Sequence, residues 1–246
     1  MRTRIRRGAA VALTTSALVL TAACGGSSET DAKPEKSGSS AKAGDPAKGE
    51  DAAKDGQSAT PLTAAQMKAG VLAVADLPKG WTASKNPADD SAYKADKAEC
   101  QPIATLLQNK VAGATIGANE DFAGGDGANQ LSHQIMTFPG TGAADFVTSI
   151  GTAAEKCTGF KTTMEGVPAE LKVEKLNPPK AGEESHGVRV SMDLGGEMEF
   201  ALHFAVARQG TGVSRVVLVP GTPASAKDFD DLAKRAGDKF AKGVQG

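Results

Sequence analysis

Few residues of this 246-residue chain have side chains suited to catalysis, and three of them are histidines: His133, His186 and His203. The sequence contains no Gly-x-Ser-x-Gly, no His-Glu-x-x-His, no P-loop and no dinucleotide-binding fingerprint. The members of a catalytic triad can lie far apart in a chain, so a hydrolase stays open if two histidines converge with a carboxylate or a serine. We predict no catalytic residue, no metal site and no cofactor, and we expect His203 to face solvent or a cleft.

Acidic residues near glycines form a second group of candidates. Asp121 and Asp126 lie in the stretch 121–129, which lacks the ligand spacing of a calcium loop and has no helix after it to bind phosphate. Glu197 and Glu199 point to the same side of one predicted strand. We therefore expect a plain loop at 123–129 and a solvated sheet face at the two glutamates.

Cys24 ends the only long apolar run of the chain. Residues 1–23 begin with four arginines, continue with an apolar stretch and end with small residues, as export signals do. The run is shorter than the ~20 residues that a membrane span needs. Thr21-Ala22-Ala23-Cys24 resembles the lipobox of bacterial lipoproteins, which implies cleavage before Cys24 and diacylglycerol on its thiol. Arg6-Arg7 leaves the export route, Sec or twin-arginine, open.

With Cys24 acylated, two thiols remain, those of Cys100 and Cys157. An even pair in an exported protein predicts a disulfide, and no Cys or His stands near either residue at the spacing of a metal site. The two residues are 57 positions apart. In the chain-entropy model, closing a loop of that length stabilises a fold by about 4 kcal/mol. Two buried free thiols are the alternative.

Residues 24–60 are predicted to be a disordered, lipid-anchored stalk. They consist mainly of Gly, Ser, Ala, Lys, Asp and Glu, and such a segment buries too little apolar surface to offset its ordering entropy.

Removal of residues 1–23 takes away four positive charges and no negative ones, which changes the formal net charge from −1 to −5. A mildly acidic chain without a basic stripe argues against nucleic acid as a partner.

Residues 61–246 have the length of one domain, and strands clustered between helices predict an α+β fold with an antiparallel sheet flanked by helices. Period-2 alternation on both sides of Gly195-Gly196 predicts a long hairpin. Apolar stripes and helix-start signals predict helices. The expected helices span 63–75, 99–110, 141–157 and 223–244, and the expected strands span 129–138, 160–164, 170–176, 185–208 (the hairpin) and 213–219.

The order of these segments carries a family resemblance. The first part of this order is Asp76-Leu77-Pro78-Lys79-Gly80-Trp81, then Cys100 opening a helix, the strand ending in "QIMTFP", and the helix 143–157 with its terminal cysteine. The second part is the hairpin, then "VSRVVLV" and a last helix. Over about residues 65–243 this order resembles the extracellular sensor domain of the mycobacterial serine/threonine kinase PknH and of actinobacterial lipoproteins that share it. The resemblance implies a central antiparallel sheet, a cleft for an unknown ligand and no enzymatic activity.

The function that these features favour is that of a lipid-anchored, extracytoplasmic ligand-binding or sensor-type lipoprotein without catalysis. The membrane is its expected partner, through lipidated Cys24, on the outer face of the cytoplasmic membrane. The ligand would be a small molecule or an envelope component, and the sequence names no ligand-binding residue. A lipid carrier with an apolar cavity and a structural envelope protein are the alternatives, and the hydrolase described above is the enzymatic one.

Overall fold

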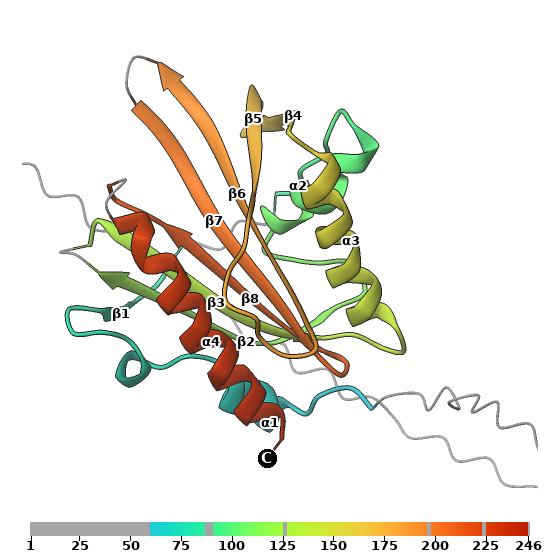
Figure 1. Ribbon diagram of the computed structural model, residues 1–246, viewed down its shortest axis with the longest axis vertical. Helices are drawn as coiled ribbons and strands as arrows, with labels where there is room; N and C mark the ends of the chain where they lie inside the picture. Colours follow the sequence, from blue (N-terminus) through green and yellow to red (C-terminus); the bar gives the residue numbers. More distant parts are fainter. Residues whose placement is uncertain (1–59, 87–90, 125–126, 196–197, 223–224, 246) are drawn as a thin grey trace, which may run out of the picture. The chain divides into compact units, whose positions relative to one another are not determined.

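An eight-stranded sheet, antiparallel throughout, forms the centre of the protein, in the order β1-β2-β3-β8-β7-β6-β5-β4 (Figure 1). The computed structural model describes residues 60–86, 91–124, 127–195, 198–222 and 225–245. Residues 1–23 and nearly all of the expected stalk, including Cys24, lie outside the described residues. The strands are β1 Thr82–Ser84, β2 Thr115–Gly124, β3 Asn129–Thr137, β4 Gly159–Met164, β5 Val167–Leu176, β6 Glu184–Gly195, β7 Met198–Gln209 and β8 Gly212–Val219.

Four α-helices and three 3-10 turns accompany the sheet in the described residues, and none of these helices is both long and apolar enough to cross a membrane. The helices are α1 Ala64–Gly70, α2 Gln101–Leu106, α3 Gly142–Lys156 and α4 Phe229–Val244, and the turns are η1 Val74–Asp76, η2 Ala98–Cys100 and η3 Ser225–Asp228. The expected capping box at α1 is present, because the Thr63 hydroxyl accepts from the Gln66 N–H while the Gln66 side chain accepts from the Thr63 N–H.

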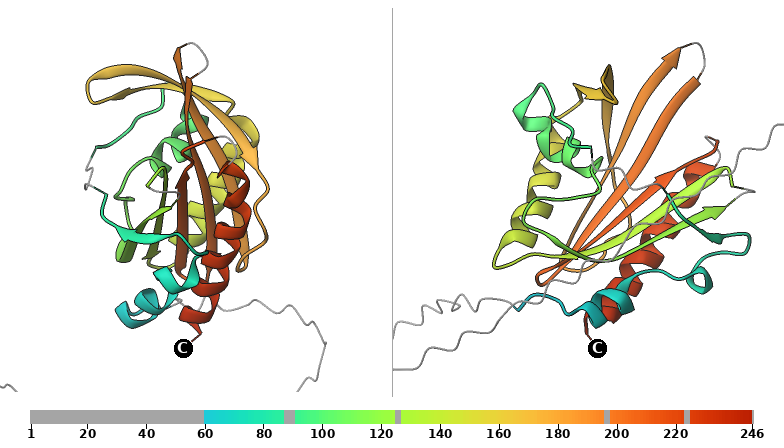
Figure 2. Two further views of the ribbon diagram at one scale, coloured as in Figure 1. Left: turned by 90° about the vertical axis from the view of Figure 1, so that its left-hand side faces the viewer. Right: turned by 180° about the vertical axis from the view of Figure 1, so that it is seen from behind.

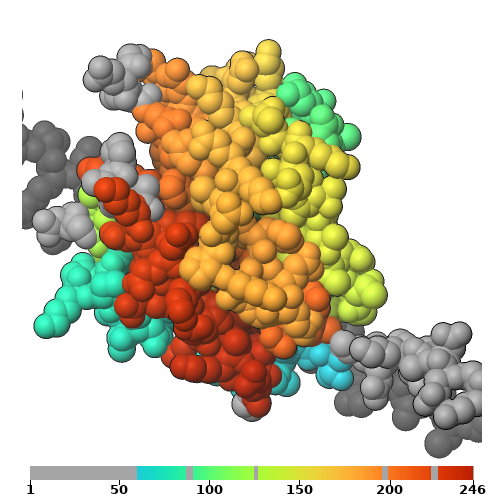
Figure 3. Space-filling view, viewed as in Figure 1, coloured from blue at the N-terminus to red at the C-terminus, as the bar shows by residue number. Residues whose placement is uncertain are grey.

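The helices pack on both faces of the sheet. Side chains alternate along a strand, so Phe204 and Val206 of β7 lie in one core with α2 and α3, whereas His203, the residue before Phe204, contacts Phe229 of α4. We call these the α3 face and the α4 face. Figure 2 shows the sheet from two further sides, and Figure 3 shows α4 (red) forming a continuous surface with the β5–β6 segment (orange). The α+β class predicted from the sequence is confirmed.

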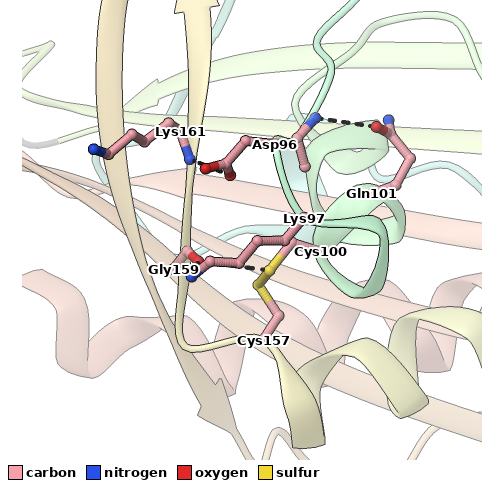
Figure 4. Close-up of a disulfide and its surroundings, with 8 residues drawn as sticks. Asp96, Lys97, Cys100, Gln101, Cys157, Gly159 and Lys161 are labelled. Carbon is pink, nitrogen blue, oxygen red and sulfur yellow. Dashed lines mark hydrogen bonds between the residues drawn. A yellow bond between two sulfur atoms is a disulfide. The ribbon is translucent and has the colours of Figure 1, made fainter.

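A disulfide between Cys100 and Cys157 joins the start of α2 to the end of α3, with the two Cα atoms 5.1 Å apart. Both residues are buried. Figure 4 shows the polar contacts around it: Lys97 Nζ donates to the Gly159 carbonyl at 2.7 Å, and the Lys161 N–H donates to Asp96 Oδ1 at 2.8 Å. The predicted pairing is therefore confirmed, and it fixes the η2–α2 segment against α3 and β4.

Several boundaries differ from the sequence prediction. The strand β2 was not predicted, and it includes residues 123 and 124, which we expected to be part of a loop. Of its side chains only Phe122 is a large buried apolar residue, so period-2 alternation is weak there. The second and fourth helices are also shorter than expected, since α2 ends at Leu106 and α4 begins at Phe229 after the turn η3.

Candidate functional site

A cleft of about 370 Å³ opens on the α3 face of the sheet. Its floor consists of residues from β2, β3, β7 and β8, and the residues that follow α2, Leu107 to Lys110, also line it. The disulfide holds the start of the same short helix, so the segment over the cleft is anchored to α3 at one end. We call this cavity the Arg215 cleft, after the cation in its lining.

Arg215 is a buried cation, only 5% exposed, and the single charged residue of strand β8. Its Nη1 donates to the carbonyls of Leu106 at 3.3 Å and Gln108 at 2.6 Å, which satisfies acceptors at the end of α2. Its Nε has no hydrogen-bond acceptor in the described part of the chain. No carboxylate in the described part of the chain forms an ion pair with Arg215 either. Burial lowers the pKa of its guanidinium to about 10. Among the described residues, the positive charge therefore has backbone carbonyls as partners but no counterion.

Gln134 of β3 lies directly across from Arg215 in the sheet register. Its Nε2 donates to the Asn109 carbonyl at 3.3 Å, whereas its buried Oε1 has no donor within the described residues. Buried polar groups are nearly always hydrogen-bonded, and a bound ligand is one of the explanations for those that are not. Two unsatisfied groups of opposite character thus lie next to each other in the cleft lining.

The floor of the cleft is divided lengthwise into a polar and an apolar half. On β2 and β3 the lining is polar, and cross-strand pairing sets Asn119 beside Gln134 and Asp121 beside Ser132. On β7 and β8 the lining beyond Arg215 is apolar, and Phe204 pairs with Val217. Such a surface can hold a molecule by hydrogen bonds along one side and by apolar contact along the other.

His133 and Ser214 form a pair that resembles a catalytic dyad in distance alone, with 2.8 Å between Nε2 and Oγ. Both residues are buried, Ser214 near Ala233 and Gly237 of α4, and the Leu72 N–H donates to His133 Nδ1 at 3.0 Å. Because Nδ1 accepts, Nε2 carries the proton and donates to the serine, which is the reverse of what a general base does. Burial lowers the pKa of His133 to about 3, against a smaller opposing effect of Asp76, so the ring is neutral. The pair is structural.

The other two histidines also hold the fold together. His186 Nε2 and Thr148 Oγ1 both contact Glu184, at 3.0 Å and 3.1 Å, so the carboxylate receives both donors and the histidine does not activate the threonine. His203 packs edge-on against Phe229 of α4, with ring centroids 5.3 Å apart. The prediction that His203 faces solvent or a cleft was wrong, because α4 covers that face of β7 and buries it.

The structure does not bring the three histidines together. His186 lies on the α3 face, since it pairs with Val206, while His203 contacts α4 on the other face. No group of three or more metal-ligating side chains occurs within the described residues, and none of the cavities found there is lined by a histidine. Of the acidic candidates, Asp121 lines the Arg215 cleft and Glu199 pairs with Arg189, whereas Asp126 and Glu197 lie outside the described part.

The sequence reasoning missed Arg215 and Gln134. A usable signal was present, because the stretch "VSRVVLV" contains a single charged residue inside a mostly apolar strand. Lys, Glu, Arg and Asp are almost never fully buried unless they are paired. An arginine at a core-facing position therefore points to a partner that the strand itself does not supply.

Comparison with known proteins places the fold but adds no site residue. No protein-family model and no curated protein matches the chain. Among solved structures, the chain is similar to the extracellular domain of PknH from Mycobacterium tuberculosis, with a TM-score of 0.54 and 16% identity over 74% of this chain and 98% of that one. A putative uncharacterized protein from Mycobacterium smegmatis matches with a TM-score of 0.42 and 13% identity, over 75% of this chain and 98% of that one. The resemblance predicted from the sequence is confirmed at the level of the fold.

Proposed function

We propose that this chain is a lipid-anchored, extracytoplasmic binding domain of the sensor type, which holds an anionic ligand in the Arg215 cleft and catalyses no reaction. The observation that carries the proposal is the buried guanidinium of Arg215, which has no counterion within the described residues and an Nε without an acceptor. A buried cation without a paired anion is costly, and an anionic ligand removes that cost by supplying the missing charge.

The polar half of the cleft suits a ligand that also carries hydroxyl groups. Gln134 offers an unused acceptor, and Ser132 and Asn119 stand in the same lining. A site that combines one buried cation with several amide and hydroxyl groups fixes the orientation of a small molecule through directional hydrogen bonds. An acidic small molecule or an acidic envelope component fits this description.

The absence of catalysis is supported by the proton positions at the two histidines that approach a hydroxyl group. At His133 the ring donates to Ser214, and at His186 both the ring and Thr148 contact one carboxylate. At His133 both ring nitrogens are therefore engaged, and at His186 Nε2 shares the carboxylate of Glu184 with the Thr148 hydroxyl and so does not take the threonine's proton. Tight binding without a base or a nucleophile is what a sensor or a carrier requires.

The anchor and the location are proposed from the sequence. The export signal in residues 1–23 and the lipobox-like Thr21-Ala22-Ala23-Cys24 support attachment to the outer face of the cytoplasmic membrane through Cys24. A lipidated residue carrying two or more chains gives a stable anchor, whereas a single chain binds membranes only marginally. Residues 24–60 would then tether the folded domain to the membrane surface.

Titration of the purified protein with inorganic phosphate and with acetate tests the binding site. We expect saturable shifts of the Arg215 Nε–Hε resonance, and a loss of affinity of at least about tenfold in Arg215→Gln, because a charge-assisted hydrogen bond is removed. Arg215→Lys keeps the charge but not the planar fork, so its affinity should fall between the two. Arg208→Gln is the matched control, since Arg208 already pairs with Glu183.

Two results would contradict the binding proposal. One is the absence of any saturable response in the wild-type protein, and the other is equal affinity in the wild-type and Arg215→Gln proteins. Urea unfolding of each variant shows whether it is folded before its affinity is compared. If Arg215→Gln does not fold, the comparison rests on Arg215→Lys and Arg208→Gln.

Mass spectrometry of the membrane fraction tests the anchor. The mature protein is expected to begin at Cys24, with the mass of diacylglycerol added to that residue, and Cys24→Ala should leave the processed protein in the soluble fraction. Cys157→Ala serves as the matched control, because it removes a different cysteine and should stay membrane-bound. A mature N-terminus upstream of residue 24, or a membrane-bound Cys24→Ala protein, would refute lipidation.

A further inference from the structure

An apolar strip continues from the Arg215 cleft onto the surface of the β6–β7 hairpin. It consists of Leu202, which lines the cleft, and of Phe200, Met192 and Leu194 beyond it. Phe200 is 38% exposed and Leu194 is 53% exposed, which is high for large apolar side chains on a strand pair. Contiguous exposed apolar surface of this kind marks sites of interaction.

The sheet register places the strip on the same face as the cleft. Leu202 pairs with Val190 and Phe200 pairs with Met192, so the side chains of Leu202, Phe200 and Met192 project to the α3 face, where Phe204 lies buried. The strand β8 pairs with β7 only from His203 to Gln209, so the hairpin continues past the end of β8 (Figure 1). In that extension the apolar side chains lose the cover that α2 and α3 give to the rest of the face.

The opposite face of the same hairpin is polar and internally satisfied. Arg189 forms ion pairs with Glu174, at 3.2 Å, and with Glu199, and Ser191 accepts a hydrogen bond from the same guanidinium. The charged groups on this face therefore pair with one another, while the other face presents the exposed apolar side chain of Phe200. This asymmetry directs an apolar partner to the α3 face only.

The distance along the hairpin sets the size of the occupant. Val206 lies across from Arg215, and Phe200 is six residues further along the same strand. At ~3.4 Å per residue this separation is about 20 Å. A molecule that contacts both ends has a compact charged group in the cleft and an extended apolar part that lies along the strip.

We propose that the ligand of the Arg215 cleft is an anionic amphiphile, with its charged head at Arg215 and its acyl or alkyl chain along Leu202, Phe200 and Leu194. This inference rests on the proposed function, because it assigns a chemical class to the ligand of the same cleft. It draws on two independent observations, the buried cation that has no counterion in the described ranges of the chain and the exposed apolar strip. The lengthwise division of the floor allows the polar side of such a molecule to face β2 and β3.

Alkyl phosphates of increasing chain length test this inference against the inorganic phosphate used above. Below its micellar concentration, dodecyl phosphate is expected to bind at least about tenfold more tightly than inorganic phosphate, since each fully buried methylene is worth roughly fourfold in affinity. Phe200→Ser should lower the affinity for dodecyl phosphate by about fivefold and leave the affinity for inorganic phosphate unchanged. Val74→Ser, at an exposed apolar residue in the turn η1, is the matched control.

The outcomes separate the two proposals. If phosphate binds at Arg215 but dodecyl phosphate binds no more tightly, the amphiphile is refuted and the anion site stands. If neither compound binds saturably, both proposals fail. Dodecyl phosphate binding that is unchanged in both Phe200→Ser and Arg215→Gln would place it elsewhere and refute the inference, as would a dimer by light scattering that Phe200→Ser converts to a monomer.

Discussion

Replacing Cys100 and Cys157 together by alanine is expected to lower the free energy of unfolding by about 4 kcal/mol. The disulfide closes a loop with a sequence separation of 57 residues, and the chain-entropy model gives that value for a loop of this length. For a domain of this size the melting temperature should fall by roughly 8–16 °C, at about 2–4 °C per kcal/mol. Urea unfolding and thermal melts of the double variant measure both quantities.

The single variants provide the control for this experiment. Cys100→Ala and Cys157→Ala each break the same bond, so each should be destabilised about as much as the double variant, and the three effects should not add. The double variant should also bind phosphate more weakly, because α2 follows Cys100 and ends in the carbonyls that hold Arg215. A decrease of less than about 1 kcal/mol in the free energy of unfolding of the double variant would show that the η2–α2 segment needs no covalent constraint.

The elements that the sequence predicted well are those with one face in a packed core. The helix α3 lines up Val147, Ile150 and Ala154 toward the sheet, and its stripe was evident. The β6–β7 hairpin was equally clear, because Val188 and Val190 alternate with the polar residues Arg189 and Ser191. In these segments periodicity reports burial directly, since one face meets apolar partners along most of the element.

The prediction failed at one strand that builds the cleft and at His203 on the opposite face of the sheet. The strand β2 contributes Asn119 and Asp121 to the cleft floor on one side, so it lacks the apolar alternation that identifies a strand. His203 was placed on the solvent side because its strand neighbours are apolar, yet this sheet is covered on both faces and α4 packs on His203. Alternation cannot distinguish a solvated face from one covered by a second helix layer. Local rules of this kind are expected to fail first at functional sites.

Lowering the pH from 7 to 5 is expected to destabilise the protein by about 2 kcal/mol through His133. The pKa of this buried ring is about 3 in the folded protein and near 6.5 in the unfolded chain, so folding requires the neutral form. Because the pKa of His133 is lower in the folded protein than in the unfolded chain, its full contribution to stability is present above pH 6.5. As the pH falls from 6.5 toward 3, this contribution decreases by about 1.4 kcal/mol per pH unit. Urea unfolding at pH 7 and pH 5 gives the difference directly.

His133→Gln separates this effect from the other groups that titrate. A glutamine at this position can accept from the Leu72 N–H and donate to Ser214, as the histidine does, but it has no proton to gain. The stability difference between pH 7 and pH 5 should therefore shrink to less than half in this variant. Burial also lowers the pKa of His203, with the same sign, so His203→Gln is measured alongside and should remove a smaller part. An unchanged pH dependence in His133→Gln would mean that groups other than His133 take up the protons when the protein unfolds.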